Sequence, residues 1–271
     1  MSKEKEAAYR YDLFVTPDWR DRFDQMVNDI VKMPQEGRIL DVNCGTGAHA
    51  IEIAERIKGK GEVVGLDPDR ERVEIARAKA QVKRLKDVTF EQGSAADIPF
   101  DEEVFDAVIG DASMSPADEV EDVLAELVRV ARPGARVVLK MTTHGSFDEF
   151  FSIYWEALLN AGIVDDVWAE LERLINERIT VSDAEQMAAR AGLRHVQCHT
   201  SKEAFPYETG RDFLYAPLIE DNFLADWLAI VPEARREEVR ENILTIIERE
   251  RHDAPFEVSI KATLIEGIKS E

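Results

Sequence analysis

The sequence predicts an α/β protein with a doubly wound, largely parallel sheet that helices cover on both faces. From residue 37 onward, short β-rich runs alternate with helical patterns, and this alternation is typical of parallel strands joined by helices that cross over the sheet. The length of 271 residues suits one large domain with insertions, or one domain plus a lid. We therefore expect one α/β unit with helical additions.

The expected strands are short runs rich in β-branched and aromatic residues. In chain order they read RILDVN, GEVVGLD, DVTFEQ, FDAVIGD, ARVVLKM, LRHVQCHTS and FEVSIKATLIEG. Helices are expected over residues 16–33, 48–58, 69–83 and 116–132. A further helix precedes the sixth strand, where Ser182 is the expected N-cap, Glu185 completes a capping box and Gly192 ends the helix.

Aromatic and acidic helical stretches interrupt this pattern after residue 141 and again after the sixth strand. Insertions of this size are usually structured or functional, so we interpret them as parts of a helical cap. The expected division is an N-terminal helical segment or lid at 1–36, a ligand-binding core at 37–146, a helical cap insertion at 147–181, and the rest of the core at 182–271, which holds strands six and seven and a helical insertion at about 205–253.

The charge of the chain argues against a nucleic-acid partner. Its 55 Asp and Glu residues outnumber 34 Lys and Arg residues, and the formal net charge of -21 repels phosphate backbones. The basic residues alternate with acidic ones along helices, as on solvated helix faces. The charged N-terminus does not resemble a signal peptide, and no apolar run approaches the ~20 residues that span a bilayer. We therefore expect no membrane partner.

Cysteine and histidine residues give no sign of a metal site. Cys44 and Cys198 are far apart and lack metal-ligand spacing, and His195 and His199, which strand alternation places on one face, have no paired acid beside them. A reducing compartment fits this cysteine usage, so we expect a cytoplasmic protein. Exposed apolar faces on the cap helices would favour a homodimer.

The stretch ILDVNCGTGAHAIEIAERI bares the backbone at Gly45 and Gly47 between a strand and a helix. Such a turn brings free helix N–H groups to a ligand at the carboxyl edge of the sheet. GTGAHA also fits the dinucleotide pattern G-x-G-x-x-A, and Asp67 follows at the distance where a carboxylate holds ribose hydroxyls. A tight turn without a ligand stays open as an alternative. The absence of a following Gly-Lys-Ser/Thr excludes a phosphate-cradling P-loop.

Asp41, just before the turn, helps to choose between ligands. A carboxylate there disfavours a pyrophosphate and favours an ammonium or sulfonium group through charge pairing. The residues therefore point to S-adenosylmethionine rather than NAD.

Four motifs in order resemble those of class I S-adenosylmethionine-dependent methyltransferases, in the small-molecule, type 11-like branch. DVNCGTG resembles the first motif, and VVGLDPD resembles the second, whose acidic residue binds the ribose. GSAADIPFDEEVFDAVIGD is similar to the adenine-contacting segment and fourth strand, and ELVRVARPGARVVLKM to the helix and strand that follow. The resemblance covers residues 37 to about 141. It implies a Rossmann-like, seven-stranded sheet, mostly parallel with an antiparallel last strand, plus helical cap insertions.

The resemblance also implies a set of cofactor contacts. The methionine portion of the cofactor is expected against the backbone at Gly45 and Gly47, with the ribose on Asp67. Relatives often fold a segment ahead of the first helix over the cofactor, which implicates Tyr11. The expected contacts are Tyr11, Asp41, Asn43, Gly45, Thr46, Gly47, Asp67, Pro68, Ser94, Ala95, Ala96, Asp97 and Asp111.

The sequence departs from the family pattern at three positions. Asn43 replaces a glycine, so that it either adds a side-chain hydrogen bond or crowds the turn. Ser94 occupies the place of an Asp that contacts adenine, which shifts this contact to the backbone around Ala95 and Ala96 or to Asp97. Ala135 replaces the second glycine of a Pro-Gly-Gly turn.

Methyl transfer from a sulfonium is an in-line displacement that depends mainly on alignment, so a dedicated catalytic residue is not required. For a hydroxyl acceptor we expect His144 to act as the base, because it follows the fifth strand at the active edge and histidine exchanges protons near neutral pH. Asp111, at the end of strand four, is expected near the reacting centre, with a helix or turn cap as the alternative.

Five aromatic residues at helical spacing either pack inside the protein or line a substrate pocket. They are Phe147, Phe150, Phe151, Tyr154 and Trp155.

We therefore expect an enzyme that transfers a methyl group from S-adenosylmethionine to a small molecule and releases S-adenosylhomocysteine. The alternatives are an NAD-binding oxidoreductase and a protein that binds S-adenosylmethionine without catalysis. The sequence leaves the methyl acceptor open, because this fold serves oxygen, nitrogen, carbon and sulfur acceptors.

Overall fold

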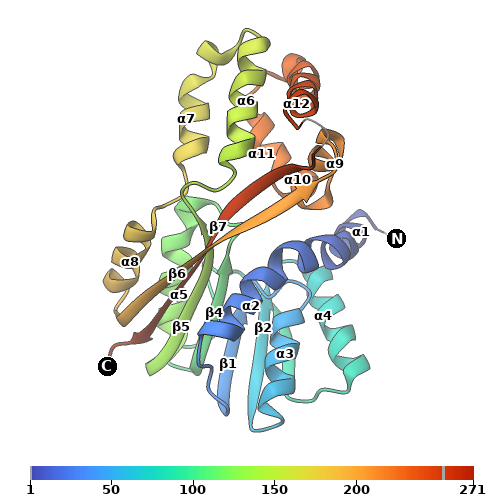
Figure 1. The fold of residues 1–271 in the computed structure, drawn as a ribbon. Helices are drawn as coiled ribbons and strands as arrows, with labels where there is room; N and C mark the ends of the chain where they lie inside the picture. The colour runs from blue at the N-terminus through green and yellow to red at the C-terminus, as the bar shows by residue number, and fades with distance from the viewer. Residues whose placement is uncertain (1, 252–253) are drawn as a thin grey trace. The chain divides into compact units, whose positions relative to one another are not determined.

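The computed structural model describes residues 2–251 and 254–271 (Figure 1). The first residue of the expected segment 1–36 and the last two residues of the expected insertion at about 205–253 lie outside the described residues. One seven-stranded sheet has the order β3-β2-β1-β4-β5-β7-β6. The strands are β1 (Gly37–Val42), β2 (Gly61–Asp67), β3 (Val88–Gln92), β4 (Phe105–Ala112), β5 (Ala131–Thr143), β6 (Leu193–Tyr207) and β7 (Phe256–Lys269).

The pairing of the strands confirms the predicted mostly parallel sheet. β1 runs parallel to β2 and β4, β2 to β3, and β4 to β5, whereas β7 is antiparallel (Figure 1). The register places Val42 beside Leu66 and Gly110, and Asp111 beside Lys140. The carboxyl ends of these strands therefore meet at one edge, where open α/β sheets bind their ligands.

The chain divides into two compact units. Unit 1 consists of Met1–Thr142, Thr180–Thr200 and Ala262–Glu271, and unit 2 of Thr143–Ile179 and Ser201–Lys261. The boundaries fall inside β6 and β7, so each of these strands contributes residues to both units. The finer division into lid, core, cap and insertion stays a prediction.

Helices pack against the parallel strands of unit 1 and bury their apolar faces. These helices are α3 (Ala48–Ile57), α4 (Arg70–Lys83) and α5 (Val120–Val130), the last preceded by a 3₁₀ turn, η2 (Ala117–Glu119). Ile53 and Ile57 of α3 and Val73 of α4 share one apolar cluster with Ile39 and Val63 of the sheet. Burial of these side chains stabilises the layered core.

The N-terminal segment is helical over a longer stretch than the expected 16–33. It consists of α1 (Lys3–Arg10), a π-helix, η1 (Tyr11–Arg20), and α2 (Asp21–Ile30). Pro17 lies inside η1, although proline has no N–H to donate and usually interrupts a helix. Trp19 is fully buried and donates a hydrogen bond to the Ser113 hydroxyl over 2.8 Å. Tertiary contacts therefore hold this rare helix type, which often occurs at functional sites.

The predicted cap of the helix before β6 was wrong by two residues. Helix α8 (Val181–Arg190) uses Thr180 as its N-cap, with Asp183 completing the capping box. TVSDAE contains two overlapping matches to the capping-box pattern, and the backbone of Thr180 is extended whereas Ser182 lies inside the helix. Gly192 follows the helix end in a left-handed conformation, as expected.

The described helices of unit 2 are mostly short. They are α6 (Asp148–Asn160), η3 (Val164–Asp166), α7 (Trp168–Asn176), α9 (Gly210–Leu214), α10 (Pro217–Asn222), α11 (Leu224–Ala229), η4 (Glu233–Arg235) and α12 (Arg236–Glu250). Across residues 2–251 and 254–271, no helix combines the length and apolar character that a bilayer crossing requires.

An aromatic cluster forms the interior of unit 2. The Phe150 and Trp227 rings stack with centroids 4.2 Å apart, and the Tyr154 hydroxyl donates to the Trp227 carbonyl over 2.6 Å. Phe147 and Phe151 are also buried, whereas Trp155 is 43% exposed. Four of the five aromatic residues singled out in the sequence therefore pack inside the protein.

Candidate functional site

The turn between β1 and α3 has a left-handed backbone at three positions. The φ angle is 56° at Asn43, 58° at Gly45 and 80° at Gly47, a region that side chains disfavour. A Cβ atom at Gly47 would lie 2.7 Å from the Phe90 ring and 2.8 Å from the Ala76 Cβ. Both the backbone and the lack of space therefore require glycine at position 47.

We expect Gly47→Ala to destabilise the protein by more than backbone strain alone. Gly134→Ala is the matched control, since Gly134 has nearly the same φ of 79° but nothing within 4 Å of a Cβ. The control should lose ~1–2 kcal/mol from the left-handed backbone, and Gly47→Ala a further ~1–3 kcal/mol from overpacking. Urea unfolding measures both, and equal losses would contradict the steric argument.

Asp67 joins the end of β2 to the glycine turn. It is 2% exposed, and its Oδ2 accepts the Gly45 N–H over 2.7 Å while Oδ1 accepts the Asp69 N–H over 3.0 Å. Burial raises the pKa of Asp67, and Arg72 opposes this effect. Each carboxylate oxygen has a second lone pair. Asp67 can therefore accept hydroxyl donors without losing its contact with the turn.

Asp41, on β1, is a buried carboxylate without a hydrogen-bond partner. The residue is 0% exposed, and neither of its oxygens accepts a hydrogen bond. Burial raises the pKa of Asp41, although Lys140 and His49 act in the opposite direction. A buried polar group without a partner is costly and calls for an explanation. A positively charged ligand group would supply the missing partner.

Asn43 ties β1 to β4 through its side chain. Its Nδ2 donates to the Asp111 carbonyl over 2.8 Å. Of the two consequences considered for this departure from glycine, the structure has the hydrogen bond. Asn tolerates the left-handed backbone better than most other residues, so the turn keeps its shape.

Asp111 belongs to a buried chain of alternating charges. Arg20 Nε lies 3.2 Å from its Oδ2, and Lys140 Nζ lies 3.3 Å from the same oxygen. Lys140 also donates to Asp24 over 2.6 Å. Burial alone would raise the pKa of Asp111, but Arg20 and Lys140 outweigh it and lower the pKa to about 2. Asp111 therefore stays ionised and is a weak proton acceptor.

Asp111 also caps the backbone that follows β4. Its Oδ1 accepts the Ser113 N–H over 2.9 Å and the Ser113 hydroxyl over 2.6 Å. This is the turn cap that the sequence offered as an alternative to a catalytic role.

The N-terminal segment lies against the glycine turn within unit 1. A Cβ atom at Gly45 would be 3.1 Å from the Tyr11 ring, and the Arg72 guanidinium lies 3.7 Å from the centre of that ring. Arg20 donates to the Asn43 carbonyl over 2.6 Å and to the Tyr11 hydroxyl over 3.3 Å. Tyr11 therefore lies at the turn, and its contact with a cofactor stays a prediction.

Thr46 and Pro68 are two further positions at which a cofactor contact is expected. The buried Thr46 hydroxyl donates to Asp12 and accepts from Lys79 over 3.2 Å, so it anchors the N-terminal segment. Pro68 is exposed after β2, and its carbonyl accepts from Gln92 over 3.0 Å.

The segment expected to contact adenine follows β3 and is tied to β2. The Gly93 N–H donates to the Asp67 carbonyl over 3.1 Å. Ser94 pairs with Asp97 in a short antiparallel bridge, and the Ser94 hydroxyl accepts the Ala96 N–H over 3.2 Å. Ala95 is buried, whereas the side chains of the other three are exposed. The segment therefore lies next to the strand end that carries Asp67.

His144 lies at the start of unit 2 rather than in the unit that holds the turn. It is exposed, with Nε2 3.3 Å from the Asn176 Oδ1, and its N–H donates to the Ile179 carbonyl over 3.0 Å. Its role as a base stays a prediction. In the part of the chain that the structure describes, no three His, Cys, Asp or Glu residues gather into a metal-binding group.

Sequence reasoning missed Arg20, Asp24 and Lys140. Arg20 and Asp24 lie four residues apart on a helical pattern and resembled a solvated face, whereas they are 6% and 5% exposed. Lys140 is 0% exposed inside the strand ARVVLKM. Because lysine is almost never fully buried without a partner, a lysine in that apolar run was the signal for a buried acid nearby.

Comparison with known proteins finds similar sequences and similar folds. The family model described as a methyltransferase domain matches residues 39–134. The chain is 31% identical over 144 residues to a demethylmenaquinone methyltransferase of Lactococcus lactis, covering 52% of this chain and 56% of that protein. It is 33% identical over 122 residues to a Geobacillus protein of the same name, covering 45% and 52%. The chain thus spans about half the length of these curated relatives.

Solved structures share the fold. The YcgJ protein of Bacillus subtilis is similar with a TM-score of 0.59 at 22% identity, covering 93% of this chain and 99% of that one. Phosphoethanolamine N-methyltransferase 2 of Haemonchus contortus, in complex with phosphomonomethylethanolamine and S-adenosylhomocysteine, gives a TM-score of 0.59 at 15% identity, covering 98% and 58%.

Proposed function

We propose that this chain, whose residues 39–134 match the methyltransferase domain model, is a class I S-adenosylmethionine-dependent methyltransferase and methylates a small molecule. The observation that carries the proposal is Asp41, which is fully buried with two unpartnered oxygens. An ammonium or sulfonium group compensates such a carboxylate, whereas a pyrophosphate would repel it. The same contrast disfavours an NAD-binding oxidoreductase.

The residues around the turn fit the cofactor part by part. Gly45 and Gly47 leave backbone bare for its methionine portion, and Asp67 has lone pairs left for the ribose hydroxyls. Tyr11 covers the turn. The remaining proposed contacts are Asn43, Thr46, Pro68, Ser94, Ala95, Ala96, Asp97 and Asp111. When bound, S-adenosylmethionine supplies an electrophilic methyl group.

Asp111 and His144 have different proposed roles. With a pKa lowered to about 2, Asp111 acts as a fixed negative charge that positions Arg20 and the turn, rather than as a base. For a hydroxyl acceptor, His144 removes the proton. His144→Ala should then lower turnover of that acceptor while cofactor affinity stays unchanged, and wild-type turnover would remove His144 from the mechanism.

The acceptor is proposed to be a small molecule, because a net charge of -21 disfavours nucleic acid. Demethylmenaquinone is the first acceptor to test, since the similar relatives, which match over about half their length, are named demethylmenaquinone methyltransferases.

The two free cysteines suit a reducing cytoplasm. Exposed Trp155 and Trp168 on α6 and α7 support the proposal of a homodimer.

The experiment is the release of S-adenosylhomocysteine from S-adenosylmethionine in the presence of an acceptor panel. Acceptor-dependent release supports methyl transfer. Cofactor binding without release for any acceptor would favour the alternative of a binding protein. Binding of NAD in place of S-adenosylmethionine would overturn both.

A substitution at Asp41 should separate stability from cofactor binding. Because burial raises the pKa of Asp41, its contribution to stability is full at low pH and is lost as the pH rises through the raised pKa. Asp41→Asn should therefore stabilise the cofactor-free protein at neutral pH by on the order of 1 kcal/mol. It should weaken S-adenosylmethionine binding at least tenfold, as loss of a charge-assisted contact of ~1.5–3 kcal/mol requires.

Asp106→Asn is the matched control, and its expected effect on stability is opposite in sign to that of Asp41→Asn. Arg38 N–H and Arg132 lower the pKa of Asp106 below its usual value against the effect of burial, so its loss should destabilise the protein and leave binding unchanged. Thermal unfolding from pH 4 to 8 and calorimetric titration measure both effects. A destabilised Asp41→Asn variant at neutral pH would refute the unpaired-charge argument.

A further inference from the structure

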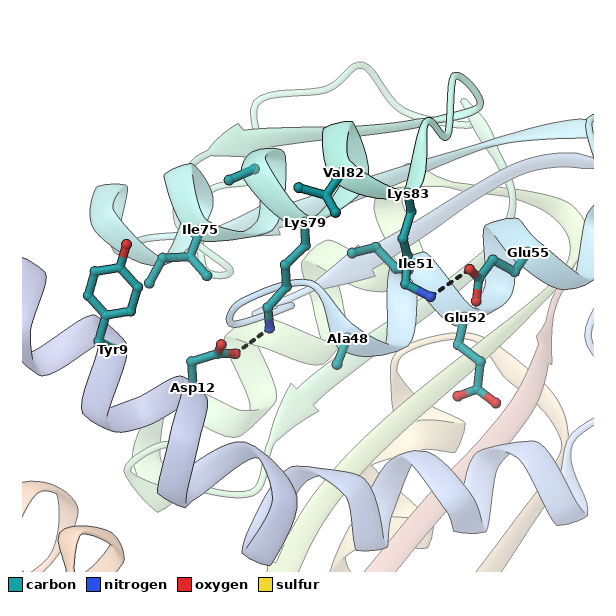
Figure 2. A pocket seen from close by; sticks show the side chains of 11 residues that line it. Tyr9, Asp12, Ala48, Ile51, Glu52, Glu55, Ile75, Lys79, Val82 and Lys83 are labelled. Carbon is teal, nitrogen blue, oxygen red and sulfur yellow. Dashed lines mark hydrogen bonds and ion pairs between the residues drawn. The ribbon is translucent and has the colours of Figure 1, made fainter.

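Unit 1 carries a groove of about 600 Å³ between α3 and α4 (Figure 2). Its walls are residues at helical spacing, namely Ala48, Ile51, Glu52 and Glu55 of α3, and Ile75, Ala78, Lys79, Val82 and Lys83 of α4. Residues three and four apart share one helix face, so one face of α3 and one face of α4 form the two walls of the groove. Tyr9 and Asp12 of the N-terminal segment border it near Ile75, and Lys83 and Glu55 border the other end (Figure 2).

The charges that line the groove are compensated. Lys79 pairs with Asp12, and Lys83 pairs with Glu55 at 2.6 Å. Glu52 pairs with Arg56 at 2.5 Å and accepts from Asn28 over 3.0 Å. An anionic or cationic ligand would therefore have to compete with an existing pair. The groove favours an uncharged occupant.

The surface between these pairs is apolar and open. Val82 is 83% exposed, which is high for a large aliphatic side chain. It lies on the same helix face as Ile75 and opposite Ile51 (Figure 2). An apolar ligand would cover Val82 and gain the free energy of removing that surface from water.

The size of the groove favours a small molecule over a protein partner. A volume of about 600 Å³ falls within the range of small-ligand pockets. Protein interfaces need roughly 20–30 residues on each side, whereas this groove is lined by 11. The lining residues of α4 run from Ile75 to Lys83, so a linear chain can lie along this helix.

We propose that this groove is a second ligand site, separate from the glycine turn, that binds an uncharged hydrocarbon chain. The inference goes beyond the proposed methyl transfer and does not depend on it. The groove shares Asp12 and Lys79 with the contacts that hold the N-terminal segment on Thr46, so a bound chain lies beside the anchor of that segment.

The test is a titration of the full chain with 1-octanol, followed by NMR of labelled Ile and Val methyl groups. Saturable shifts are expected at Ile51, Ile75 and Val82. Octanoate and octylammonium, which have chains of similar length but carry a charge, should bind at least tenfold more weakly. Shifts that do not saturate, shifts centred on other methyl groups, or equal affinity for a charged analogue would each overturn the proposal.

Ala78 and Val82 are exposed in the groove, so substitutions there should leave the protein folded. Val82→Asp introduces a charge and Ala78→Leu fills the space, and each should weaken octanol binding at least tenfold. Leu159→Asp is the matched control, because Leu159 is 46% exposed on α6 of unit 2 and the substitution adds the same charge. The control should bind octanol within twofold of wild type. Wild-type affinity in both groove variants would place the bound chain elsewhere and refute the site.

Discussion

Replacing Lys140 with Met is expected to destabilise the protein by ~3–5 kcal/mol, the loss that follows when one partner of a buried ion pair is removed. Lys140 is 0% exposed and lies 2.6 Å from Asp24 and 3.3 Å from Asp111. Asp111 keeps Arg20 as a partner at 3.2 Å, but Asp24 would lose its nearest cation. Chemical denaturation at neutral pH measures the loss.

Two controls make this prediction specific. Lys202→Met removes an exposed lysine that pairs with Glu149 at 3.4 Å and should change stability by less than ~1 kcal/mol. The double variant Asp24→Asn, Lys140→Met should be more stable than Lys140→Met alone, because no unpaired carboxylate remains on Asp24. A double variant that is no more stable than the single one would contradict the pairing.

The same substitution should change how stability depends on pH. Burial alone would raise the pKa of Asp24, but Lys140, His49 and Arg20 outweigh it and lower the pKa. A carboxyl group with a lowered pKa stabilises the folded state above its unfolded pKa, and this contribution is lost as the pH falls through the folded value. The stability difference between wild type and Lys140→Met should therefore narrow in acid.

Replacing Asp67 with Ala is expected to weaken cofactor binding at least tenfold. Each hydrogen bond that involves a charged group contributes ~1.5–3 kcal/mol, and the proposed ribose contact contains two. Because Asp67 also accepts the Gly45 and Asp69 N–H groups, some stability will be lost as well. Calorimetric titration with S-adenosylhomocysteine measures the affinity.

Asp69→Ala separates the two effects of the Asp67 substitution. Asp69 caps α4 by accepting from Glu71 and Arg72 over 2.8 and 3.1 Å, so its loss should cost ~1 kcal/mol of stability. It should leave cofactor affinity within about twofold. If both variants bind equally, or if Asp67→Ala binds as wild type, the ribose assignment fails.

The sheet was predictable because its strands are continuous apolar runs that alternate with helices. The glycine turn was predictable because such a turn requires glycine, and the sequence shows it. At position 47 the positive φ angle and the close packing against Phe90 exclude a larger residue. Asp41 could be placed before the turn from its position in β1, although its lack of a hydrogen-bond partner needed the three-dimensional structure.

The N-terminal segment was less predictable, since tertiary contacts override local preference there. Pro17 inside η1 contradicts helix propensity, yet buried Trp19 and the contacts of Arg20 hold the segment in place. The charge cluster was missed for the same reason, because Arg20 and Asp24 meet Asp111 and Lys140 only in the folded chain. Lys140 in its apolar run was the one local signal, and it did not identify the partners, which are distant in sequence.

The most direct measurement is a calorimetric titration of the wild-type protein with S-adenosylmethionine, and with NAD under the same conditions. A positively charged donor that relieves the isolated carboxylate of Asp41 should bind with a stoichiometry of one, whereas the dinucleotide should give no saturable heat. Saturable binding of NAD together with no binding of S-adenosylmethionine would contradict the claim that Asp41 and the glycine turn bind a positively charged methyl donor.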